Sequence, residues 1–194
     1  MEKLKIKIII GSTRQNRFSD KPAEWIFQEA KDRKEVEAEI LDLRDFPMPF
    51  YSEPVSPAKS PGQYGNEVVE RWAGKIKEGD GFLIVAPEYN HGYPAVLKNA
   101  LDHLYLEWNN KPIGFISYGG VGGARAVEQL RQVVIELSMM PIRDSIHILA
   151  FWDLLDEQGN LKENAFVPLK KKADNFLNQM VRWTVILKKA REQL

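Results

Sequence analysis

The sequence has no cysteine, no excess of either charge and no long hydrophobic run. Without cysteine it has no disulfide framework, no thiol nucleophile and no thiolate metal site, which fits a reducing compartment. Lys plus Arg and Asp plus Glu each number 27, so no net field attracts nucleic acid or an anionic membrane. No apolar run is long enough to span a bilayer. We therefore expect a soluble cytoplasmic protein without nucleic-acid or membrane partners.

Residues suited to metal binding or hydrolysis are also few. The three histidines, His91, His103 and His147, lack metal-ligand spacing, so we expect no metal site. Asp102 and Glu107 form no obvious acid and base pair, and no Gly-x-Ser-x-Gly motif occurs. We expect no catalytic side chain, and any enzyme activity would depend on a bound cofactor.

Apolar strand-like segments alternate with amphipathic helical segments along the whole chain. This pattern predicts an α/β fold, a doubly wound five-stranded parallel sheet with helices on both faces. We expect strands at 4–10, 36–43, 81–86, 112–118 and 142–149. The chain length suits a single domain over 1–194 that ends in a long helix at about 166–190. That helix either packs on the sheet or contributes to a dimer contact.

The segment after the first strand has the composition of a phosphate-binding loop. Gly11 permits a sharp turn, and the next residues, Ser12 to Asp20, include three hydroxyl side chains with Arg14 and Arg17. A helix follows, and its first amides favour an anion. The loop lacks the Gly-Lys-Ser/Thr of a Walker A motif and the Gly-x-Gly-x-x-Gly of a dinucleotide fold.

Two further loops follow predicted strands. The loop 87–93 is polar and aromatic, which suits a flat ring, and Pro94 then begins a helix. The loop 117–126 contains four glycines, which indicate either close approach of a planar ligand or a tight turn. The proline-rich segment 46–65 is expected to be an extended loop that walls a binding site, packs on a subunit or simply connects two elements.

The predicted topology brings the first two loops together. In a flavodoxin-like sheet of order 2-1-3-4-5, ligands bind outside the carboxyl ends of the strands, between the first and third strands. The phosphate loop and the loop 87–93 follow those two strands. FMN occupies this crevice in flavodoxin itself, which makes FMN the expected ligand.

Three segments carry a family resemblance: Gly11-Ser12-Thr13-Arg14, then Pro87-Glu88-Tyr89-Asn90-His91-Gly92-Tyr93-Pro94 with Leu97-Lys98-Asn99-Ala100-Leu101-Asp102, and finally Ser117-Tyr118-Gly119-Gly120. They resemble the NAD(P)H-dependent FMN reductase family over roughly the first 150 residues. The resemblance implies a flavodoxin-like fold, non-covalent FMN, NADPH or NADH as co-substrate, and a homodimer or homotetramer. It also implies hydride transfer through the flavin to a small electron acceptor such as a quinone, an azo dye or free flavin.

The same resemblance assigns the cofactor-binding residues. It implies that the FMN phosphate and ribityl chain are held by Ser12, Arg14, Phe18 and Ser19. The isoalloxazine would lie along Pro87, Glu88, Tyr89 and Asn90, and its pyrimidine side would be closed by Ser117, Gly119 and Gly120. Arg17 departs from the small residue of many members, and would strengthen phosphate binding or reach a pyridine-nucleotide phosphate.

Two other functions are compatible with this sequence. One is an FMN-binding electron carrier or redox sensor that docks a protein partner, and the other is a flavin-free scaffold of the same fold. Flavodoxin-type carriers tend to be markedly acidic, whereas this chain has no net charge, which favours the enzyme.

Overall fold

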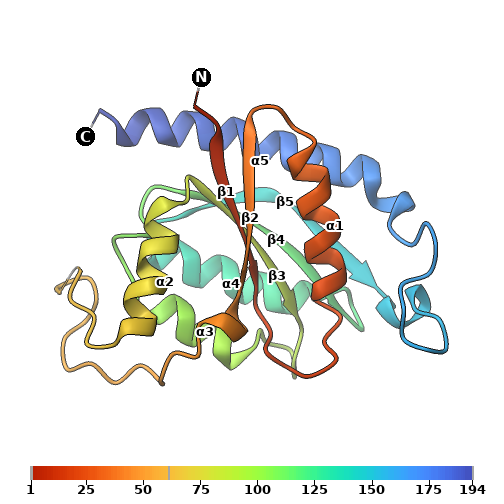
Figure 1. Cartoon of the computed structure of the whole chain (residues 1–194), viewed down its shortest axis with the longest axis horizontal. Coiled ribbons are helices and arrows are strands. Elements are labelled where there is room, and N and C mark those ends of the chain that lie inside the picture. Colours follow the sequence, from red (N-terminus) through yellow and green to blue (C-terminus); the bar gives the residue numbers. More distant parts are fainter. Residues whose placement is uncertain (1, 61, 194) are drawn as a thin grey trace.

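The computed structural model describes residues 2–60 and 62–193. Five parallel strands form one sheet in the order β2-β1-β3-β4-β5, as the sequence predicts (Figure 1). The strands are β1 (Leu4–Ile10), β2 (Val36–Asp42), β3 (Gly81–Pro87), β4 (Pro112–Gly119) and β5 (Met140–Leu149). Every residue of β3 and β4 is buried, as expected for central strands covered on both faces.

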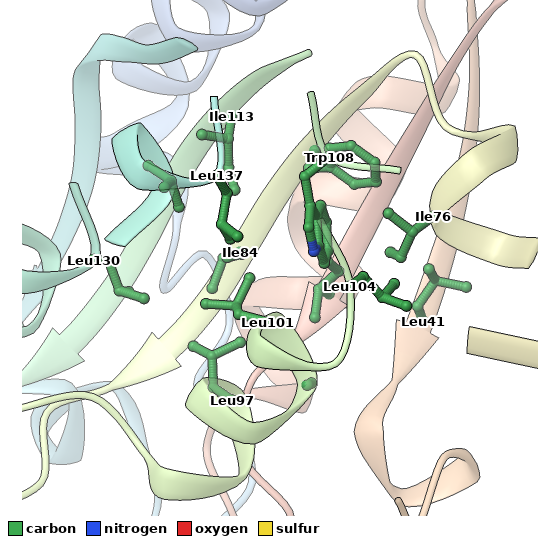
Figure 2. Packing of buried hydrophobic residues seen from close by; sticks show 14 of the residues in the cluster. Leu41, Ile76, Ile84, Leu97, Leu101, Leu104, Trp108, Ile113, Leu130 and Leu137 are labelled. Atoms are coloured by element: carbon green, nitrogen blue, oxygen red, sulfur yellow. The ribbon is translucent and has the colours of Figure 1, made fainter. Parts of the chain in front are cut away.

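Helices cover both faces of the sheet (Figure 1). One face packs against α1 (Asp20–Lys31) and α5 (Lys170–Arg191), whose apolar residues share a cluster with β1, β3, β4 and β5. The other face packs against α2 (Glu67–Glu78), α3 (Ala95–Asp102) and α4 (Ala124–Glu136). Figure 2 shows this second core, in which Leu97 and Leu101 of α3 lie near Ile84 of β3. Both faces are therefore filled by side chains, and the free space lies at the edge of the sheet.

Several element boundaries differ from the sequence prediction. β2 ends at Asp42 because the Asp42 side chain accepts from Arg44 N at 2.9 Å and starts a 3-10 turn. β5 begins at Met140, two residues earlier than expected. The last helix begins at Lys170 rather than Phe166, since a short 3-10 turn containing Pro168 precedes it.

The proline-rich segment contains no helix or strand over 47–60 and 62–66, as its composition predicts. It is fastened to α3, because Asn99 donates to Pro49 O at 2.8 Å and accepts from Tyr51 N at 2.9 Å. His103 adds a hydrogen bond to Pro49 O at 2.9 Å. No helix within the described residues combines the length and apolar character needed to cross a membrane.

Candidate functional site

The phosphate loop leaves β1 and enters α1 at the carboxyl edge of the sheet (Figure 1). Gly11 allows a close approach there, because a Cβ atom would lie 3.0 Å from Leu97 Cδ2 and 3.3 Å from Val85 O, closer than ordinary van der Waals contact. Asn16 adopts a left-handed conformation with φ of 51°, for which asparagine is well suited. Ser12 is buried and its Oγ lies 2.8 Å from the Tyr89 hydroxyl. The first two loops are thus joined directly.

Main-chain amides of this loop are open to a ligand. Among the residues that the structure describes, the N–H groups of Thr13 and Gln15 have no acceptor, and that of Arg14 has only a long bond of 3.3 Å to Ser12 Oγ. The exposed Arg14 side chain and the N-terminus of α1 add positive charge. Successive amides around a left-handed residue form a concavity that binds anions. The loop therefore has the donors that a phosphate requires.

The second loop is a tight turn over Tyr89 to Gly92. Tyr89 N donates to Gly92 O at 2.8 Å and Gly92 N donates to Tyr89 O at 2.9 Å. Asn90 and His91 both have positive φ, 49° and 68°, as in a type I′ turn. Next to this turn, the Glu88 carboxylate accepts from Arg125 Nε at 2.6 Å, which ties the turn to the start of α4.

The third loop contains a tight turn, which is one of the two alternatives that its glycines suggested. Gly123 has φ of 76°, and a Cβ there would lie 2.7 Å from Ser117 Cβ, so this glycine closes a tight turn. A Cβ at Gly120, in contrast, would meet no atom within 4 Å. Ser117 Oγ donates to Gly122 O at 2.7 Å and lies 2.8 Å from Nδ1 of His147. Burial lowers the pKa of His147, which favours a neutral ring in this structural role.

A cavity of about 850 Å³ lies between the first two loops, the end of β4 and the segment after β5. Its size is within the range of about 300–1,000 Å³ typical of small-molecule sites. Seven of the residues predicted from the sequence line it: Arg14, Arg17, Phe18, Pro87, Glu88, Tyr89 and Gly119. The other predicted residues do not line it: Ser12, Ser19, Asn90, Ser117 and Gly120.

Ser19 supports this cavity from behind, and Phe18 packs beside it. Ser19 is fully buried and its Oγ lies 2.6 Å from the Tyr118 hydroxyl, so it makes no side-chain cap on α1. Phe18 packs edge-on against Tyr118 at 5.1 Å between ring centroids. Burial raises the pKa of Tyr118 to about 12, so its hydroxyl stays neutral and able to donate.

The segment after β5 forms a wall that the sequence analysis missed. Phe151 lies 4.9 Å from Phe18 and 5.1 Å from Tyr118 between ring centroids, and Leu155 and the residues 157–159 continue the wall. Asp156 shapes this turn by accepting from Asn160 N at 2.8 Å. The composition of residues 156–160 is typical of a turn, but no local signal relates them to a loop at 11–20.

Arg17 is held by carboxylates at the rim of the cavity. Its side chain is only 2% exposed and forms ion pairs with Asp20 and Asp42. Burial by itself would lower the pKa of Arg17, but the two carboxylates raise it above its usual value. The guanidinium charge is therefore compensated within the protein.

The residues present fit FMN. Arg14 lines the cavity and belongs to a loop whose amides include two without an acceptor, Tyr89 lines the cavity wall, and Gly119 lines the cavity from the third loop. Over the described part of the chain, no group of three or more His, Asp and Glu side chains is arranged to hold a metal ion. The arrangement suits an anionic aromatic cofactor.

Comparison with known proteins identifies relatives of this chain. The sequence model of the NADPH-dependent FMN reductase family matches residues 4–153, so the wall at 155–159 lies beyond the matched segment. An NAD(P)H-dependent FMN reductase of Schizosaccharomyces pombe is 44% identical over 135 residues, covering 70% of this chain and 68% of the relative. A quinone reductase of Escherichia coli K12 is 34% identical over 147 residues, covering 72% and 73%.

Solved structures share the fold at lower identity. The flavoenzyme FerB, an NAD(P)H:(acceptor) oxidoreductase from Paracoccus denitrificans, superimposes with a TM-score of 0.70 at 21% identity, covering 92% of this chain and 98% of FerB. The family assignment rests on the match over residues 4–153 and on the 44% identity to the Schizosaccharomyces pombe enzyme. This chain belongs to the NADPH-dependent FMN reductase family.

Proposed function

We propose that this chain uses FMN in the 850 Å³ cavity to oxidise NADPH or NADH and to reduce a small acceptor such as a quinone, an azo dye or free flavin. The observation that carries the proposal is the meeting of three loops at one edge of the sheet. One loop offers open amides and Arg14, and the next offers Tyr89. Bound FMN supplies the chemistry, because it takes up a hydride and passes on electrons.

The residues have binding and positioning roles in this proposal. Arg14 and the amides of the loop 12–19 bind the phosphate, while Ser12, Phe18 and Ser19 support the loop and the ribityl chain. Pro87, Glu88, Tyr89 and Asn90 lie along the ring system. Ser117, Gly119 and Gly120 lie at its pyrimidine edge, where main-chain amides stabilise negative charge. No side chain is assigned a proton-transfer step.

We also propose a single cytoplasmic domain that assembles as a homodimer or homotetramer. Exposed apolar side chains support such a contact, because Phe50 is 81% exposed, Leu149 65% and Trp152 53%. Leu149 and Trp152 flank Phe151 of the cavity wall. A subunit contact over Leu149 and Trp152 would bring a second subunit close to the cofactor.

The test is turnover without any protein partner. The purified FMN-loaded chain is mixed with NADPH, or with NADH, and a simple benzoquinone, and absorbance of the reduced nucleotide is followed at 340 nm. Continuous oxidation that depends on the quinone supports the enzyme. Oxidation that requires a second redox protein would instead support the electron carrier and contradict the proposal.

A further inference from the structure

The carboxylate of Asp42 lies beside the start of the phosphate loop. Asp42 ends β2 and pairs in register with Ile10, the last residue of β1. Gly11 and the loop follow Ile10 immediately. An acidic side chain next to a proposed phosphate site repels the phosphate. Its presence there therefore suggests that it has another role.

Arg17 connects this carboxylate to the loop. Its NH1 group donates to Asp42 Oδ1 at 2.7 Å and also to the main-chain carbonyl of Ser12. Its Nε group donates to Asp20 Oδ1 at 2.7 Å. All three acceptors are atoms of the protein, and the Arg17 side chain is 2% exposed. The guanidinium thus fixes one carbonyl of the loop.

Arg44 fixes the next two carbonyls. Its Nε group donates to Thr13 O at 3.4 Å and its NH2 group donates to Arg14 O. The main-chain N–H of Arg44 donates to Asp42 Oδ1 at 2.9 Å, so the same carboxylate binds the Arg17 guanidinium and the main chain from which the Arg44 side chain extends. Three successive loop carbonyls, of Ser12, Thr13 and Arg14, therefore accept hydrogen bonds from two arginines joined by Asp42.

The direction of the carbonyls determines the direction of the amides. In a trans peptide the C=O of one residue and the N–H of the next point in opposite directions. The carbonyls of residues 12, 13 and 14 point toward Arg17 and Arg44. The amide N–H groups of residues 13, 14 and 15 therefore point away from these two arginines. Two of these amides, of Thr13 and Gln15, have no acceptor among the described residues.

We propose that Arg17 and Arg44, oriented by Asp42, are positioning residues that hold the loop amides ready for the FMN phosphate without contacting that phosphate. The proposal rests on the proposed function, because it assumes that FMN is the ligand. Preorganised donors bind more tightly because the loop loses less entropy on binding. The acidic residue beside the phosphate site then has a purpose, which is to align the two arginines.

Asp42→Asn separates this role from direct charge attraction, because the two predict opposite signs. Loss of the carboxylate loosens both arginines, and we expect FMN to bind about tenfold more weakly, the equivalent of one charge-assisted hydrogen bond. If Arg17 contacted the phosphate instead, removing a nearby negative charge would strengthen FMN binding. The control is Asp45→Asn, which removes the same charge from an exposed residue of the same turn.

The measurement is titration of the flavin-free protein with FMN and, separately, with riboflavin, which lacks the phosphate. Asp42→Asn should lose affinity for FMN and keep that for riboflavin, while Asp45→Asn matches the parent for both. Equal or tighter FMN binding by Asp42→Asn, or equal losses for both flavins, would overturn the proposal. If the parent itself binds no FMN, the proposed function fails instead.

A second variant covers the case in which Asp42→Asn does not fold. Arg44 is exposed, so Arg44→Ala preserves the core. This variant should bind FMN about tenfold more weakly than the parent and riboflavin equally well. Its control is Arg71→Ala, another exposed arginine, which donates to Asp45 O at 3.0 Å. Equal FMN affinities of Arg44→Ala and Arg71→Ala would contradict the positioning role.

Discussion

Gly120→Ala tests directly whether a ligand occupies the space over the third loop. A methyl group at Gly120 meets no protein atom within 4 Å, and the residue does not have the left-handed conformation that opposes alanine. The flavin-free protein should therefore be unchanged or more stable by about 0.4–1 kcal/mol, since alanine restricts the unfolded chain. FMN placed against Gly120 would collide with the methyl group, and we expect about tenfold weaker binding.

Gly123→Ala is the matched control, because it has the opposite pattern. There a Cβ would lie 2.7 Å from Ser117 Cβ and 2.9 Å from Tyr118 N, and φ is 76°. The clash and the strained backbone should together cost about 2–4 kcal/mol of unfolding free energy. Urea unfolding of the flavin-free proteins and FMN titration measure the two effects. Parental FMN affinity in Gly120→Ala would refute the placement of the flavin edge at this loop.

Three further predictions concern other residues. Arg14→Ala should weaken FMN binding more than Tyr89→Ala, because it removes charge from the phosphate site; a titration curve equal to the parent's would refute that role. Burial lowers the pKa of Lys111 from 10.5 to about 7, so the unfolded chain binds more protons between these values and this residue's contribution to stability rises with pH. The unfolding free energy of the parent should therefore rise by about 2 kcal/mol relative to Lys111→Met between pH 7 and pH 9, and a constant difference in urea unfolding would contradict this. Glu88→Gln breaks the partly exposed ion pair with Arg125 and should weaken FMN binding by about threefold. Glu128→Gln is the control, and its FMN affinity should equal that of the parent in the same titration.

Much of the fold was predictable because its signals are local. Apolar runs bounded by glycine or proline locate β1, β3 and β4, and the alternation of strands and helices predicts a parallel sheet. The proximity of the loops at 11–19 and 87–93 then follows from the strand order alone. The bond between Ser12 Oγ and the Tyr89 hydroxyl, at 2.8 Å, agrees with that prediction.

The contacts of Arg17 were not predictable, because they depend on strand pairing. The contact with Asp20 is local in sequence, because the two residues are only three positions apart. The contact with Asp42 requires β1 and β2 to pair so that Ile10 lies opposite Asp42. A single sequence does not specify that register, so it left two expected roles for Arg17, at the FMN phosphate or at a pyridine-nucleotide phosphate, and did not indicate this ion pair.

The wall after β5 illustrates the same limit. Phe151 reaches Phe18 across more than one hundred residues of sequence, and the turn at 156–160 has only a generic turn composition. The glycines of the third loop could not be separated by sequence either. Only the three-dimensional surroundings distinguish Gly123, which is enclosed, from Gly120, which is open.

The most direct test of the account is an FMN titration of the purified chain after flavin removal, followed by quenching of flavin fluorescence. We expect saturable binding near one FMN per chain, and weaker binding of riboflavin, because riboflavin has no phosphate for the loop to bind. Absence of saturable FMN binding would contradict the central claim that the three loops form a flavin site.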